Sequence, residues 1–213
     1  MKKIISILVI CCLIFIIGCN EQTTYEDEFN QSKIEISKLK DVNIEIEKEN
    51  YLLKNLMLAD IDVGEVSLDS QIAESYYEEA GIAYENQNYN LVSSNCRIAR
   101  NHFSDESQGY LKIKANLESK ELNDSLVTIY IVSMELLSET ALNMFEACEH
   151  FEVAARYYDT YFNTDVLYND VSFDMGASEM EMMNKKIKLH DENIRKYNAN
   201  IEKYGIELKK RLE

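Results

Sequence analysis

Residues 123–162, NDSLVTIYIVSMELLSETALNMFEACEHFEVAARYYDTYF, form the longest stretch with helical periodicity and contain neither glycine nor proline. Apolar side chains recur every three or four residues, which places them on one face of a helix beginning at Asn123 or Asp124. Between Val127 and Val132 nearly every side is apolar, as is typical of a central, buried helix. The predicted core stripe consists of Tyr130, Met134, Leu137, Ala141, Met144, Cys148, Phe151, Ala155, Tyr158 and Phe162.

The composition of the whole chain favours the same fold class. Its 213 residues include no proline and only 6 glycines, so little interrupts the backbone hydrogen bonds of long helices. We therefore predict an all-α, up-and-down helical bundle, with residues 19–213 as a single helical domain.

Shorter helical patterns flank this stretch and define a predicted helical head over residues 69–163. Asp69 is a candidate N-cap for a helix that ends at Gln87, and Ser104 or Asp105 is expected to start a new helix after a break. An acidic linker is predicted at residues 59–66, and a loop at residues 163–178.

A heptad pattern precedes the head, over residues 25–58. Its seam contains two asparagines, Asn43 and Asn50, which fix the register of a coiled coil at some cost in stability. The seam positions are Phe29, Ser32, Ile36, Leu39, Asn43, Ile46, Asn50, Leu53 and Met57.

The same alternation of three and four recurs in residues 177–212, from Ile187 to Arg211. We predict that residues 25–58 and 177–212 pair as an antiparallel, coiled-coil-like stalk, which would set the basic residues 209–211 against the acidic residues 26–28. A parallel oligomeric coiled coil is the alternative, and the sequence leaves it open.

The N-terminus combines two lysines, an apolar run from Ile4 to Ile17, and Gly18 followed by Cys19. Fourteen apolar residues span only about 21 Å as a helix, which is short for a bilayer core of about 30 Å. The segment resembles a bacterial lipoprotein signal peptide at residues 1–18 with its lipobox. The resemblance implies acylation of Cys19, with palmitate among the acyl chains, and an extracytoplasmic protein anchored by lipid to the cell membrane or outer membrane.

Residues 73–104 resemble a single, degenerate tetratricopeptide-type hairpin. The matching positions include Ala80, Gly81 and Ala83, with Cys96 and Ala99 in the second helix. The resemblance implies close helix approach at Gly81 and a protein-binding surface, for which the candidate residues are Tyr77, Tyr84 and Tyr89. Two ordinary amphipathic helices with core tyrosines are the alternative interpretation.

The charge pattern limits the possible functions. Basic residues number 22 and acidic residues 38, a net charge of −16, which argues against a nucleic-acid partner. Acidic residues in the linker, such as Asp60 and Asp62, and in the predicted loop, namely Asp165, Asp170 and Asp174, depart from calcium-loop spacing.

We predict no catalytic residues, no metal site and no cofactor, because the sequence contains no phosphate loop, nucleophile elbow or paired-cysteine zinc pattern. Of the cysteines, Cys96 and Cys148 are expected to be buried thiols, with a disulfide as the alternative. The predicted function is a membrane-anchored, non-enzymatic protein-interaction module of the cell envelope. An envelope protein that binds a small ligand or ion through the tyrosines or the acidic loops is the alternative.

Overall fold

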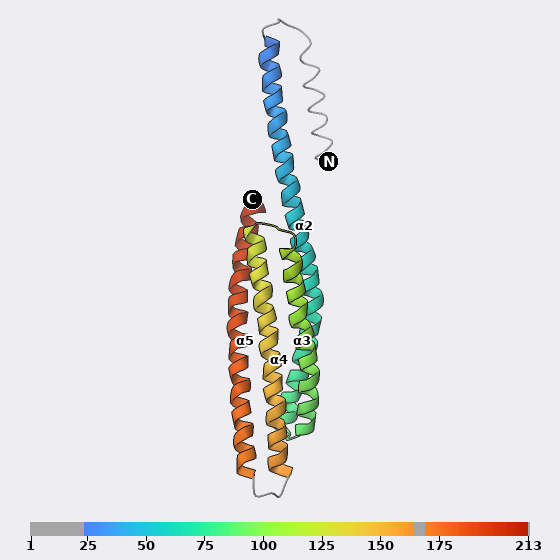
Figure 1. Cartoon of the computed structure of the whole chain (residues 1–213), viewed down its shortest axis with the longest axis vertical. Helices are drawn as coiled ribbons and strands as arrows, with labels where there is room; N and C mark the ends of the chain where they lie inside the picture. The colour runs from blue at the N-terminus through green and yellow to red at the C-terminus, as the bar shows by residue number, and fades with distance from the viewer. Residues whose placement is uncertain (1–23, 164–168, 213) are drawn as a thin grey trace. The chain divides into compact units, whose positions relative to one another are not determined.

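The computed structural model describes residues 24–163 and 169–212, and over these residues the chain is all-α (Figure 1). The helices are α2 (Thr24–Glu85), α3 (Tyr89–Glu118), α4 (Ser125–Asn163) and α5 (Asn169–Leu212). The predicted up-and-down helical bundle is confirmed. The predicted signal peptide, Cys19 and Asp165 lie outside the described residues.

The chain divides into two units, residues 1–52 and residues 53–213. In the first unit, the described part is the N-terminal stretch of α2. Its apolar seam side chains are open to solvent: Phe29 is 60% exposed, Ile36 51%, Leu39 59% and Ile46 53%.

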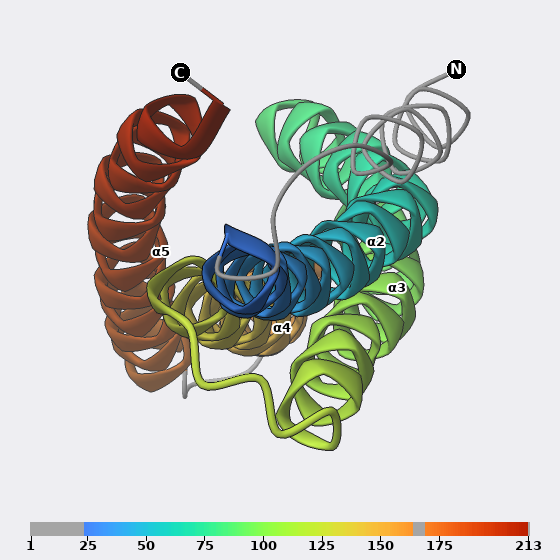
Figure 2. The same ribbon diagram turned by 90° about the horizontal axis from the view of Figure 1, so that it is seen from above.

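In the second unit, α4 is the central helix and lies between α3 and α5 (Figure 2). The side chains of Ser138 and Ser107 join α4 to α3, with 2.8 Å between their hydroxyl oxygens. The Tyr130 hydroxyl donates a hydrogen bond of 2.7 Å to Asp60 of α2. All the predicted core positions of α4 are buried except Phe162, which is 53% exposed near the end of the helix.

By length and composition, α4 is the helix among the described residues that is apolar enough to cross a membrane. Half of its apolar window is buried inside the bundle, which is the environment of a core helix.

Two short connections shape the ends of the bundle. Between α2 and α3, the side chain of Asn88 caps α3 by accepting a hydrogen bond of 3.3 Å from the backbone N–H of Leu91. Before α4, Asp124 accepts a hydrogen bond of 2.8 Å from the N–H of Leu126, and its second oxygen accepts one of 2.7 Å from Arg211. Asp124 therefore caps α4, as predicted, and also holds the end of α5.

Three predicted interruptions are absent from the described helices. The expected linker at residues 59–66 and the expected start at Asp69 both lie within α2, and α3 continues through Ser104 and Asp105. The predicted loop at residues 163–178 is also shorter, because α5 begins at Asn169. The polar and small residues at these positions predict breaks in the helices. Buried side chains before and after each predicted break continue the same apolar face, so the helix is not interrupted.

Within the second unit, the C-terminal helix packs along α4, a contact that the heptad pattern did not indicate. Contacts between α5 and α4 run from Glu179 beside His150 to Arg211 beside Asp124, with Tyr204 packed edge-on against Tyr130. The described partner of residues 177–212 is therefore α4, where we expected residues 25–58. The periodicity indicated an apolar face correctly, but it does not specify which helix covers that face. Pairing with residues 25–52 stays a prediction.

Gly109 is the glycine that allows the closest approach of α2 and α3. A Cβ atom at this position would lie 2.5 Å from Cγ2 of Val66 and 3.0 Å from Cγ1. A Cβ atom at Gly81 would have no heavy atom of a neighbouring helix within 4 Å, whereas the tetratricopeptide-like pattern implies a close contact there.

We predict that Gly109→Ala lowers the free energy of unfolding by about 1–3 kcal/mol, because the added methyl group overpacks the stiff Val66 side chain. Gly81→Ala is the matched control and should raise it by up to about 1 kcal/mol, since alanine favours a helix and has room here. Urea unfolding of both variants tests this. Equal effects of the two substitutions would contradict the assigned contact.

Candidate functional site

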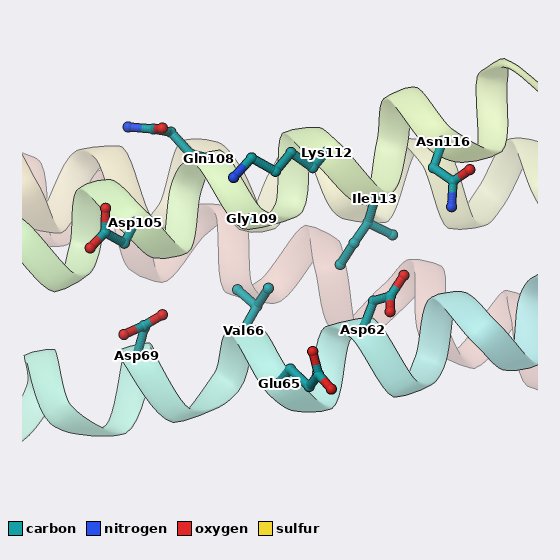
Figure 3. A pocket seen from close by; sticks show the side chains of 10 residues that line it. All are labelled: Asp62, Glu65, Val66, Asp69, Asp105, Gln108, Gly109, Lys112, Ile113 and Asn116. Carbon is teal, nitrogen blue, oxygen red and sulfur yellow. The ribbon is translucent and has the colours of Figure 1, made fainter.

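An open groove of about 620 Å³ runs between α2 and α3 (Figure 3). Each helix contributes side chains spaced by one turn, so a continuous strip of each faces the groove. The groove is lined by Asp62, Glu65, Val66 and Asp69 of α2 and by Asp105, Gln108, Gly109, Lys112, Ile113 and Asn116 of α3.

The groove combines an apolar middle with acidic edges. Val66 and Ile113 point from the two helices into the space between them, and Gly109 adds no side chain there (Figure 3). Four carboxylates line the groove and Lys112 is its one basic residue, so its formal charge is −3. At one end, Nδ1 of His102 lies 3.0 Å from a carboxylate oxygen of Asp69.

The four carboxylates of the groove are spread out and do not form one cluster. The carboxylates are distributed along two helices, and within the described residues no group of three His, Cys, Asp or Glu side chains is close enough to hold a metal ion. Spaced carboxylates beside apolar side chains instead complement an amphipathic surface that carries several lysines or arginines.

Next to the groove, Glu106 is a buried carboxyl group with 6% of its surface exposed and no hydrogen-bond partner for its Oε2 atom. Burial raises its pKa to about 7, and the charges of Glu74 and Asp69 add to that rise, whereas hydrogen bonds with Ser70 and Tyr110 lower it. A substantial fraction of Glu106 is therefore protonated at neutral pH.

A second charged cluster lies between α3 and α4, and in it a buried carboxylate is paired with arginines. The carboxylate of Glu152 is almost fully buried and pairs with Arg97 at 3.2 Å, with Arg100 at 3.1 Å and with Arg156. Residues 60–180 contain 6 basic residues, and these three arginines are half of them. The cluster compensates the buried charge, so we interpret it as part of the scaffold.

The tyrosines chosen from the sequence lie in an aromatic cluster of the core. Tyr89 is buried, and Tyr77 and Tyr84 pack against the core cluster. The ring centroids of Tyr77 and Phe151 are 6.1 Å apart, and those of Tyr84 and Phe151 are 5.5 Å apart. The three tyrosines therefore fill space between helices, and their role in partner binding stays a prediction.

Cys96 and Cys148 are free, buried thiols, as expected. A hydrogen bond with Cys96 raises the pKa of Cys148 above its ordinary value, and burial raises it further. The Cys148 thiolate, which is the reactive form, is therefore scarce at neutral pH.

The groove was not predicted, although its signal is present in the sequence. The sequence pattern predicts a linker at Asp62 and Glu65 and a helix start at Asp105. Residues in such interruptions are not expected to share one helical face. A continuous helix instead aligns Asp62, Glu65 and Asp69 at intervals of three and four. Asp60, which we had weighed as a calcium ligand, accepts the hydrogen bond of Tyr130.

We predict that Glu106→Gln removes a pH dependence of stability. Since the folded pKa is about 7 against 4.5 for an ordinary glutamate, the folded state retains a proton that the unfolded state loses. Stability from Glu106 is therefore full below pH 4.5, declines as the pH rises through about 7, and is constant above. At pH 8 the glutamine variant should be more stable by about 3 kcal/mol, since a pKa difference of one corresponds to about 1.4 kcal/mol.

Urea unfolding between pH 4 and pH 8 measures this difference. Asp105→Asn, at the exposed neighbouring position, is the matched control and should retain the pH dependence that Glu106 confers. Parallel profiles for Glu106→Gln and the wild type would contradict the assigned titration.

Comparisons with protein-family models, with curated proteins and with solved structures found no match for this chain.

Proposed function

We propose that this protein is a non-catalytic, membrane-tethered interaction module of the cell envelope, which binds a basic segment of a partner protein in the groove between α2 and α3. The observation that carries the proposal is the groove itself, with four carboxylates around the apolar side chains of Val66 and Ile113. An amphipathic helix with apolar residues on one side and lysine or arginine beside them has matching chemistry.

Electrostatics support a protein partner of this kind. The chain carries a net charge of −16, and residues 60–180 contain 23 acidic residues against 6 basic ones. Such a surface attracts cationic partners over a distance of about 10 Å at moderate salt and repels polyanions. It also disfavours direct adsorption to anionic lipids, so a covalent lipid is the more effective means of attachment.

The tether rests on residues 1–19. A basic start, an apolar run that is short for a membrane span, and Gly18-Cys19 before a polar stretch together favour cleavage and acylation at Cys19. Acyl chains on Cys19 would hold the helical domain at a membrane without any spanning helix.

We predict that Cys19→Ala releases the protein from membranes or leaves it unprocessed, because both acylation and cleavage need the thiol. Cys12→Ala is the matched control, since it removes a thiol inside the apolar run, and it should leave anchoring unchanged. Membrane fractionation and the intact mass of the purified chain provide the readout. Normal mass and full membrane retention of Cys19→Ala would refute the tether.

We predict that the groove can be mapped by a photo-cross-linking residue at position 108. Gln108 lines the groove, whereas Leu111 lies on the same helix, is 47% exposed and does not line it. Cross-links to another protein should form from position 108 and not from position 111. Mass spectrometry should place them beside lysine or arginine residues of that protein.

Charge reversal provides the second arm of this experiment. The pair Glu65→Lys and Asp105→Lys should weaken cross-linking from position 108 by about tenfold, which corresponds to about 1.4 kcal/mol. Equal cross-linking from positions 108 and 111 would refute the groove as the binding surface. If position 108 captures no protein but spermidine raises the melting temperature of the wild type alone, the groove binds a small cation instead.

A further inference from the structure

The N-terminal part of α2 has an apolar seam that none of its described neighbours buries. In heptad notation, Phe29, Ile36, Asn43 and Asn50 occupy position a, and Ser32, Leu39 and Ile46 occupy position d. Four of these side chains, those of Phe29, Ile36, Leu39 and Ile46, are between 51% and 60% exposed. Large apolar side chains repeated along one stripe mark an interaction surface.

We propose that residues 29–50 of α2 form a parallel, in-register, two-stranded coiled coil with a second copy of this chain. The inference goes beyond the proposed groove and does not depend on it. Three features of the seam select this partner and this orientation: its asparagines, its flanking charges and a hollow on its surface.

The asparagines favour identical, parallel helices. In a parallel pair, position a faces position a, so Asn43 meets Asn43 of the other copy and their amides can hydrogen-bond to each other. In an antiparallel pair, position a faces position d, so that Asn43 would face an apolar side chain such as Leu39 and its amide would be left unsatisfied. In the single chain, the Nδ2 atom of Asn43 donates to Glu47 at 3.0 Å, an exposed contact that the dimer can replace.

The flanking charges give the same orientation. A parallel pair sets position g of one helix beside position e five residues later in the other helix. This brings Glu35 to Lys40 and Glu49 to Lys54 of the second copy, which are opposite charges at equivalent places two heptads apart. An antiparallel pair would set position g beside position g, so that Glu35 and Glu49 would face glutamates of the second copy.

The surface also contains a hollow of suitable composition. A shallow, mainly apolar depression of about 430 Å³ is lined by Ile36, Leu39, Lys40, Asn43 and Ile44. Ile36, Leu39, Lys40 and Asn43 occupy positions a, d, e and the next a, which form the hole that receives a side chain from position d of a parallel partner. Leu39 of the second copy is the side chain that the proposed register places there.

Self-cross-linking of single cysteines tests the proposal in membranes that contain the full-length protein. Ile36→Cys, Asn43→Cys and Asn50→Cys place a thiol at three successive a positions, and a mild oxidant should convert all three variants to disulfide-linked dimers of doubled mass. Asp41→Cys and Lys48→Cys, at the outward position f of the same helix, are the matched controls and should remain monomeric on a non-reducing gel.

The pattern of cross-links decides the orientation as well as the contact. An antiparallel pair brings at most one position opposite itself, so a dimer from only one of the three variants would overturn the parallel register. Dimers from none of the three, or equal dimers from the f positions, would overturn the coiled coil itself. In detergent, Leu39→Asp should halve the native mass while the helical circular dichroism of the bundle is retained, and an unchanged mass would also overturn the proposal.

Discussion

The structure depends on covering the apolar surface of α4. This helix buries side chains on several of its faces, from Leu126 near its start to Tyr158 near its end. One neighbouring helix cannot cover so wide a surface, since two packed helices contact each other along a single stripe. The neighbours α3 and α5 lie along α4, and α2 reaches it through contacts such as that of Asp60 with Tyr130. The need to cover α4 explains why α3 and α5 are long and continuous, because a break in either helix would expose part of α4.

The sequence predicts the helices well and their ends less well. The periodicity of α4 and the capping role of Asp124 could be recognised because both signals are local. The false break at Ser104 shows the limit of local signals: serine and aspartate favour caps in isolation, but Phe103 and Ser107 continue a buried face across that position. The partner of α5 could not be recognised at all, because an apolar stripe carries no information about which of several apolar helices meets it. The acidic groove could not be predicted because of a false break of the same kind: its residues on α2 share one face only when α2 is continuous.

Two buried carboxyl groups show how this acidic chain keeps a stable interior. Glu152 meets three arginines, so its negative charge is compensated where it is formed. No basic side chain of the described residues contributes to the pKa of Glu106, and the raised pKa means that the proton itself provides part of the compensation. Glu106 also lies next to the groove. Asp69 lines the groove, and its charge contributes to the raised pKa of Glu106. Burial is the main cause of the raised pKa and the charge of Asp69 is a minor one, so a cation that approaches Asp69 would lower the pKa of Glu106 only slightly.

The two proposed binding surfaces use different residues of α2: the seam uses residues 29–50, and the groove uses Asp62, Glu65, Val66 and Asp69. At the start of the bundle, Leu56 and Ala59 are buried, whereas Met57, the last position of the heptad seam, is 61% exposed. Successive residues of a helix are rotated by about 100°, so a seam that includes Met57 and a bundle face that includes Leu56 point in distinct directions. Of the two seam positions at the start of the bundle, Met57 is therefore exposed and Leu53 is half-buried. None of Asp62, Glu65 and Asp69 belongs to the seam, so a dimer formed through the seam would carry two acidic grooves. A partner with two basic segments would then bind the second groove at a raised effective concentration once the first is occupied.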